Sequence, residues 1–241
     1  MVNLNTIVYD IINTAYGGES TDDADISFRQ VAYWIKQERS LLLSQMLGKK
    51  MRVAASCVEY INCVHLTPVD ASECCEIDLG VHVLKSINPI PTSVQRNGRD
   101  SILAVESLDG MRPFSETTDT RRKWNKYNKY TNSKQRWYIK NNHLYVSCDM
   151  RIDAVKVTGI FEDPEDVWKM NYCTSSENPI LSSCEYDWDF PFPISLSMAE
   201  QVASIILQKR IAIILNAPSD DENNAKEDTA VRGTPNQGKA N

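Results

Sequence analysis

The chain has 241 residues, of which 42% are hydrophobic and 24% are charged, and its formal net charge is −6. This composition is typical of a globular protein that can bury a core of its own, rather than of a disordered or fibrous chain. No apolar run approaches the ~18–20 residues of a membrane-spanning helix, and the acidic balance argues against a protein that binds nucleic acid through its whole surface.

Cysteines and histidines give no indication of a metal site. Seven cysteines are scattered without a CxxC spacing, and three histidines lie without a ligand spacing such as HxxxH. The first residues lack a basic segment before their apolar run, which itself contains Asp10, so we expect no signal peptide. We therefore predict no metal and no cofactor, with buried thiols in a reducing cytoplasm.

The N-terminal part is predicted to form two helices. Apolar residues recur at helical spacing from Asn3 to Tyr16, and Gly17-Gly18 is expected to end this helix. Ser27 and Gln30 form a capping box that begins a second helix, which ends near Gly48. The apolar stripe of the second helix is predicted to comprise Phe28, Val31, Ile35, Leu42 and Met46.

The middle of the chain changes to the alternation of β-strands. We expect strands over residues 58–66, 81–87, 102–106, 136–140, 143–148 and 154–160. One face of the first strand, interrupted at Asn62, is predicted to carry Val58, Tyr60, Val64 and Leu66. Asp109-Gly110 marks a turn, and Asn141-Asn142 predicts a two-residue hairpin because asparagine tolerates positive φ.

Two further helices are predicted towards the C-terminus. Asp163-Pro164-Glu165-Asp166 is a helix start, and the prolines in residues 172–193 indicate a loop or extended connection after that helix. A capping box at Ser197–Glu200 opens the last helix, whose apolar surface is broad enough to require burial in the core or against another subunit. The candidate inter-subunit residues of this helix are Ile205, Ile206, Ile213 and Ile214.

The sequence thus predicts an α+β protein in which a helical body built from both chain ends carries an inserted β-rich region. The expected parts are the N-terminal helices (1–50), the β-rich insertion (51–162) and a connection with a C-terminal helix that completes the helical body (163–216). Residues 217–241 are polar and are expected to form a flexible C-terminal tail.

The sequence has none of the common catalytic or nucleotide-binding motifs. The chain contains no GxxxxGK[ST], GxGxxG or GxSxG sequence. Cys63 and His65 could act as a thiol and its base, but two residues apart on a strand they are better explained as ordinary strand residues. We predict that the protein is not an enzyme.

Residues 121–140 combine eight Lys or Arg and five aromatic residues with no acidic residue. This basic-aromatic stretch allows three interpretations: contacts with nucleic acid, an arm that docks on an acidic neighbouring subunit, or a solvated hairpin extension. Gln135–Lys140 is predicted to be a core strand, so the exposed part narrows to residues 121–134. Its partner- or DNA-facing residues are predicted to be Arg121, Arg122, Lys123, Lys126, Lys129 and Lys134.

Several segments resemble, in order, a neck protein of crAss-like bacteriophages. They include ISFRQVAYWIKQERSLLLSQ (Ile26–Gln45), CVHLTPVDASECCE (Cys63–Glu76), INPIP (Ile87–Pro91), WNKYNKYT (Trp124–Thr131) and FEDPEDVW (Phe161–Trp168). The resemblance extends from about Met1 to Asn216. The chain is therefore similar to the head-to-tail connector, or ring, proteins of short-tailed phages.

This resemblance implies a structural protein that forms a homo-oligomeric ring, commonly twelve-fold, in the virion neck between capsid and tail. The ring would join the portal protein to the tail and continue the channel for genomic dsDNA, after assembly in the host cytoplasm. The implied partners are further copies of the chain, the portal, other neck or tail ring proteins and the DNA, with no membrane. The alternative is a monomeric nucleic-acid-binding module that uses residues 121–140.

Overall fold

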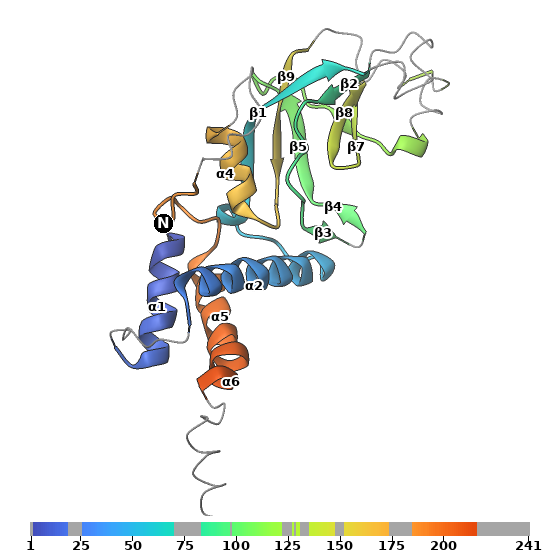
Figure 1. Ribbon diagram of the computed structural model, residues 1–241. Helices are drawn as coiled ribbons and strands as arrows, with labels where there is room; N and C mark the ends of the chain where they lie inside the picture. Colours follow the sequence, from blue (N-terminus) through green and yellow to red (C-terminus); the bar gives the residue numbers. More distant parts are fainter. Residues whose placement is uncertain are drawn as a thin grey trace, which may run out of the picture.

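The computed structural model describes residues 2–18, 26–69, 83–96, 98–121, 127, 129–130, 135–147, 152–173 and 185–215, and the tail predicted over residues 217–241 lies outside this part. Helices and a large, mostly antiparallel sheet are both present, so the predicted α+β class is confirmed. The sheet occupies one end of the molecule and helices α1, α2 and α5 the other (Figure 1). Both ends of the chain therefore contribute to the helical part.

Helices α1 (Leu4–Tyr16) and α2 (Phe28–Gly48) begin and end close to the predicted residues. The Asn3 side chain accepts a hydrogen bond from the Thr6 backbone N–H, 2.8 Å away, and so caps α1. Gly17 ends α1 in the left-handed conformation, with a φ of 67° that favours glycine. The Ser27 hydroxyl caps α2, as predicted, by accepting from a backbone N–H at 3.2 Å.

The buried face of α2 differs from the predicted stripe. Phe28, Leu42 and Met46 are only partly buried. The helix contacts α1 and α5 on one side and β3 on another, so it is covered from several directions and buries charged as well as apolar side chains. Its buried residues are Val31, Ala32, Trp34, Ile35, Glu38, Arg39, Leu43 and Leu47.

Seven of the described strands form one sheet, in the order β5-β9-β1-β2-β8-β7-β6, and β3 and β4 pair separately. Neighbouring strands of the large sheet are antiparallel except for β6 and β7, which are parallel. The strands are β1 (Glu59–Pro68), β2 (Val83–Ser86), β3 (Gln95–Arg96), β4 (Arg99–Asp100), β5 (Ile102–Ser107), β6 (Ser115–Glu116), β7 (Arg136–Lys140), β8 (His143–Ser147) and β9 (Ala154–Gly159). The predicted hairpin is confirmed, because Asn141 and Asn142 join β7 to β8 with φ values of 50° and 58°.

Strand β1 contains a β-bulge near Asn62. Its register against β9 shifts between Ile61 and Val64, so the bulge changes which side chains share a face. Ile61 is fully buried, whereas Tyr60 is 50% exposed. The interruption predicted at Asn62 is this bulge, but the prediction that Tyr60 shares one face with Val64 and Leu66, which are buried, is wrong.

Helix α4 (Pro164–Tyr172) starts as predicted, because the Asp163 side chain accepts a hydrogen bond from the Glu165 backbone N–H at 2.9 Å. The last helix consists of α5 (Leu196–Ile206), a π-helical turn η3 (Leu207–Ile211) and α6 (Ala212–Leu215).

The cap of α5 is Ser195, whose hydroxyl accepts from the Met198 backbone N–H at 3.3 Å. The predicted capping box at Ser197–Glu200 is therefore wrong by two residues. Ile194 and Ala199 are both buried on either side of the cap, in the positions of a hydrophobic staple, and this fixes where the chain enters the helix.

Two hydrophobic cores stabilise the fold. One combines α1, α2 and α5 with residues such as Phe192 and Ile194 of the preceding segment. The other lies on the sheet and includes Val167 and Met170 of α4. The division of the chain into four parts stays a prediction.

The cysteines depart from the expectation of thiols alone. Cys57 is buried and Cys63 is exposed, and both are free. Cys173, at the end of α4, is buried and disulfide-bonded to a partner outside the described residues. Sequence spacing did not indicate this bond, because it depends on which cysteines the fold brings together.

Candidate functional site

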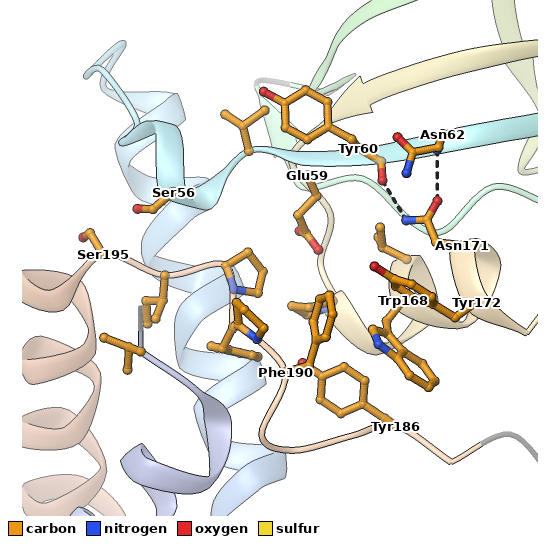
Figure 2. A pocket seen from close by; sticks show the side chains of 18 of the residues that line it. Ser56, Glu59, Tyr60, Asn62, Trp168, Asn171, Tyr172, Tyr186, Phe190 and Ser195 are labelled. Carbon is orange, nitrogen blue, oxygen red and sulfur yellow. Dashed lines mark hydrogen bonds between the residues drawn. The ribbon is translucent and has the colours of Figure 1, made fainter. Parts of the chain in front are cut away.

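A hollow of about 1000 Å³ lies between β1, α4 and residues 185–196 (Figure 2). We refer to this hollow as the aromatic groove. Its aromatic lining residues are Tyr60, Trp168, Tyr172, Tyr186, Phe190 and Phe192. Residues 185–195 form one wall of the groove, with a turn closed by the hydrogen bond from the Phe190 backbone N–H to the Asp187 carbonyl. Prolines 191 and 193, which lack a backbone N–H, disfavour a helix before α5.

The rings contact one another along one wall of the aromatic groove. Trp168 lies 5.3 Å from Tyr172 and 5.5 Å from Tyr186, measured between ring centroids. Tyr172 and Phe190 meet edge to face at 5.4 Å. Contacts of this kind add to the stability that burial alone gives, so the wall is held in one arrangement.

Large side chains of the groove remain open to solvent. Tyr60 is 50% exposed, Tyr172 is 61% exposed and Leu196 is 65% exposed. Several exposed apolar side chains around one hollow are typical of a surface that another molecule covers. The aromatic groove is therefore the candidate interaction site of the described residues.

The Asn171 side chain joins α4 to the bulge of β1. Its amide nitrogen donates to the Tyr60 carbonyl at 2.7 Å, and its amide oxygen accepts from the Asn62 backbone N–H at 2.9 Å (Figure 2). A bulge leaves backbone groups without strand partners, and this amide supplies both a donor and an acceptor. The floor of the groove is thereby fixed to α4.

Arg39 lies at the junction between the helices and the sheet, and its side chain is fully buried. Its guanidinium donates to the carbonyls of Pro193 and Phe161, each at 2.9 Å, and forms an ion pair with the Glu59 carboxylate at 3.0 Å. It also lies 5.6 Å from the centre of the Phe192 ring. One side chain of α2 therefore holds the groove wall, the end of the sheet and β1 together.

Two charged residues line the aromatic groove, Lys156, whose ammonium lies 5.3 Å from the centre of the Tyr60 ring, and Glu59, which is buried with 8% of its surface exposed. Burial raises the pKa of Glu59 to about 7, although the Arg39 charge and hydrogen bond act in the opposite direction. Burial and the nearby Glu59 carboxylate also raise the pKa of Tyr186. The groove thus has an ionisable carboxyl at its base.

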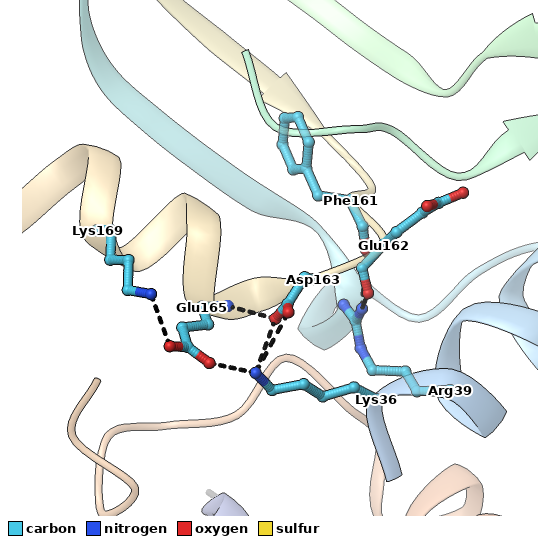
Figure 3. A network of polar contacts seen from close by, with 7 residues as sticks. All are labelled: Lys36, Arg39, Phe161, Glu162, Asp163, Glu165 and Lys169. Carbon is cyan, nitrogen blue, oxygen red and sulfur yellow. Dashed lines mark hydrogen bonds and ion pairs between the residues drawn. The ribbon is translucent and has the colours of Figure 1, made fainter. Parts of the chain in front are cut away.

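A second polar network lies at the start of α4 (Figure 3). Lys36 of α2 forms ion pairs with Asp163, at 3.2 Å, and with Glu165. Lys169 binds Glu165 at 2.7 Å. Burial alone would raise the pKa of Glu165, but the hydrogen bonds from Lys169 and Lys36 lower it. This network ties α4 to α2 outside the buried Arg39 contacts.

Replacing Asp163 with alanine is expected to lower the free energy of unfolding by about 1–2 kcal/mol, because α4 loses its cap and Lys36 loses a partner. Urea denaturation followed by tryptophan fluorescence measures this loss. Asp163→Asn is the matched control, since asparagine caps helices equally well but carries no charge. An equal loss in both variants would assign the effect to the ion pair and contradict the role of the cap.

Only part of the basic-aromatic stretch lies within the described residues. Arg121 and Lys129 are described, whereas the predicted contact residues Arg122, Lys123, Lys126 and Lys134 lie outside. Tyr127 and Tyr130 are 73% and 82% exposed, and the Lys129 ammonium lies 6.0 Å from the centre of the Tyr130 ring.

The end of the stretch forms β7, as predicted for a core strand. Trp137 is buried in the core of the sheet. Tyr138 is also buried and stacks on Tyr145, with 5.1 Å between ring centroids. Both faces of β7 are therefore covered.

The four isoleucines predicted on an inter-subunit helix have different surroundings. Ile206 is fully buried in the core of its own chain, and Ile205 and Ile214 are half-buried. Ile213 is 69% exposed. The contact with a neighbouring subunit stays a prediction, and Ile213 offers most of the surface available for it.

Other chemistry gives little indication of a reaction. Among the described residues, no cluster of three potential metal-binding side chains occurs, and no helix there is both long and apolar enough to cross a membrane. The Cys63 sulfur lies 3.5 Å from His65 Nε2. Burial raises the pKa of the Cys63 thiol, which is the opposite of what a nucleophilic thiolate needs.

The aromatic groove was not predicted from the sequence, although the residues that form it are conspicuous there. Residues 185–193 alternate acidic, aromatic and proline residues, and α4 carries two more aromatic side chains. Their common location became visible only with the fold, because α4 and residues 185–196 meet through tertiary contacts. Arg39 was likewise missed, since a charged residue within a helix is usually exposed.

An open aromatic groove, the exposed Tyr127 and Tyr130, and the exposed Ile213 are apolar surfaces typical of proteins that act by assembling with other macromolecules. A family model described as phage tail ring protein 2 matches residues 6–229. Because this match covers most of the sequence, the chain belongs to the family of phage tail ring protein 2. No curated protein matches the chain.

The family confirms the resemblance to a ring protein of crAss-like phages. The chain is thus a structural protein of the phage tail and a component of the virion. The aromatic groove, the basic stretch and Ile213 are surfaces that such a protein can use for assembly.

Proposed function

We propose that the chain forms a homo-oligomeric ring in the neck of the virion, joining the portal protein to the tail and continuing the channel for genomic dsDNA. The observation that carries this proposal is the match to the phage tail ring family over residues 6–229. The exposed side chains of the aromatic groove and Ile213 support self-association, since a monomer would leave these apolar groups in water.

Charge distribution supports a position around DNA. The chain is acidic overall, with a net charge of −6, but residues 121–134 carry six basic and no acidic side chains. Repetition around a ring turns this local charge into a positive belt, while the acidic remainder keeps DNA from adhering to the channel. A twelve-fold ring is the symmetry we expect.

The proposal is tested by purifying the full chain and measuring its mass, alone and with the portal protein. Native mass spectrometry and electron microscopy are expected to show closed rings, either directly or after the portal is added. A chain that stays monomeric and fails to bind the portal under assembly conditions would contradict the proposal.

The second candidate is a monomeric module that binds nucleic acid through residues 121–140. The exposure of Tyr127 and Tyr130, with Lys129 beside a ring, favours it, because bases stack on such rings. A monomer whose affinity for DNA falls steeply with salt would support this alternative.

A further inference from the structure

We propose that the aromatic groove of one subunit receives the basic arm, residues 121–134, of a neighbouring copy, so that the ring closes through arm-into-groove contacts. This inference rests on the proposed homo-oligomeric ring and deepens it by naming the two surfaces that meet. Its occupant is a second copy of the chain.

The segments around the groove are strongly acidic. Residues 162–173 and 185–189 carry seven acidic side chains and one basic one. Lys36 pairs with Asp163 and Glu165, but Glu185, Asp187 and Asp189 are exposed and form no ion pair with another described residue. The lining of the groove itself holds one carboxyl, Glu59, and one lysine, Lys156. The negative charge that a cationic partner can neutralise therefore lies on residues 185–189, which border the groove.

The chemistry of the arm complements this surface. Residues 121–134 contain six Lys or Arg, three aromatic residues and no acidic residue. Lysine and arginine bind both the faces of aromatic rings, which the groove offers, and carboxylates, which the bordering residues Glu185, Asp187 and Asp189 offer. Its volume of about 1000 Å³ is at the upper end of ligand sites, so it holds several side chains rather than one.

The strands that flank the arm lie away from the groove. The arm connects β6 to β7, which form one edge of the sheet. The groove lies beside β1 and α4, and β1 is three strands away from β7, a distance of ~14 Å across the sheet. In Figure 1, α4 and β7 accordingly lie on opposite sides of the β-rich part. Two different complementary surfaces make a head-to-tail contact, which closes into a ring when the rotation between copies allows it.

Charge-reversed full-length chains test the contact. The arm variant carries Arg121→Glu, Arg122→Glu and Lys123→Glu, and the groove variant carries Tyr172→Lys and Glu185→Lys. Tyr172 and Glu185 are exposed, and a lysine in the last turn of α4 suits the helix dipole, so both variants are expected to fold. Each variant alone is expected to lose rings by about tenfold or more, as charge reversal in an interface does.

Mixing the two variants gives the decisive result. The native arm of the groove variant meets the native groove of the arm variant, and the glutamates of the arm variant meet the lysines of the groove variant, so both contacts of the mixture are complementary. Native mass spectrometry is expected to show rings in which the two variants alternate. A single chain with both sets of reversals is expected to regain rings, because glutamates then face lysines.

The control is a variant with Tyr33→Lys and Glu200→Lys, which makes the same charge change at exposed residues of α2 and α5 outside the groove. It is expected to form rings like the native chain. Rings from the groove variant alone, equal loss in the control, or an absence of mixed rings would overturn the arm-into-groove contact. Failure of the native chain itself to form rings would instead overturn the proposed function.

Discussion

Replacement of Arg39 by leucine is expected to lower the free energy of unfolding by about 3–5 kcal/mol at pH 7.5. The Arg39 side chain is fully buried and binds the carbonyls of Pro193 and Phe161 and the carboxylate of Glu59. Leucine removes every one of these donors, and the buried Glu59 carboxyl loses the partner that favours its charged form. Urea denaturation measures the loss, and circular dichroism shows whether the variant still folds.

Two further variants serve as controls for the effect of Arg39→Leu. Arg29→Leu changes an exposed arginine of the same helix and is expected to have an effect of less than ~0.5 kcal/mol. Arg39→Lys keeps the charge but cannot reproduce the fork of donors, so an intermediate loss is expected. If Arg39→Leu were as stable as Arg29→Leu, the buried guanidinium would not hold the junction together.

The stability of the protein is expected to fall between about pH 5 and pH 8 because of Glu59. Its pKa is raised from 4.5 to about 7 in the folded protein, mainly by burial. The folded state therefore holds a proton in this range that the unfolded state has released. Raising the pH through this window removes the proton from the buried carboxyl and costs about 2–4 kcal/mol of stability.

Comparison with Glu59→Gln isolates this contribution. Glutamine cannot ionise, so the difference in unfolding free energy between the two proteins should change across the window, whereas the other titrating groups affect both alike. Denaturation at about pH 5, 6, 7 and 8 measures it. Parallel curves for the two proteins would show that Glu59 keeps an ordinary pKa.

The ends of several helices were predictable because neighbouring residues determine them. Gly17, Ser27 and Asp163 act through hydrogen bonds or dihedral angles within a few residues. The cap of α5 shows the limit of this reasoning, because two serines compete within three positions. Burial of Ile194 by the rest of the fold selects Ser195.

The aromatic groove and its supports depend on contacts that local patterns do not record. Arg39 binds Pro193, 154 residues away, and Asn171 binds Tyr60, 111 residues away. The bulge in β1 also reversed the face expected for Tyr60 and so placed this ring in the groove. The basic stretch could be recognised from the sequence, because its charge and aromatic content follow from composition and do not depend on the fold.

Because of the π-helical turn, the last helix carries apolar side chains on two of its sides. In an unbroken α-helix, residues seven apart such as Ile206 and Ile213 point to nearly the same side. Here Ile206 and Ile211 are both buried five residues apart, across η3, and Ile213 is 69% exposed. The extra residue in the π-helical turn thus changes the side of the helix on which the residues after it lie. The first half of the helix closes the core of its own subunit, and the second half directs an isoleucine outwards, away from that core.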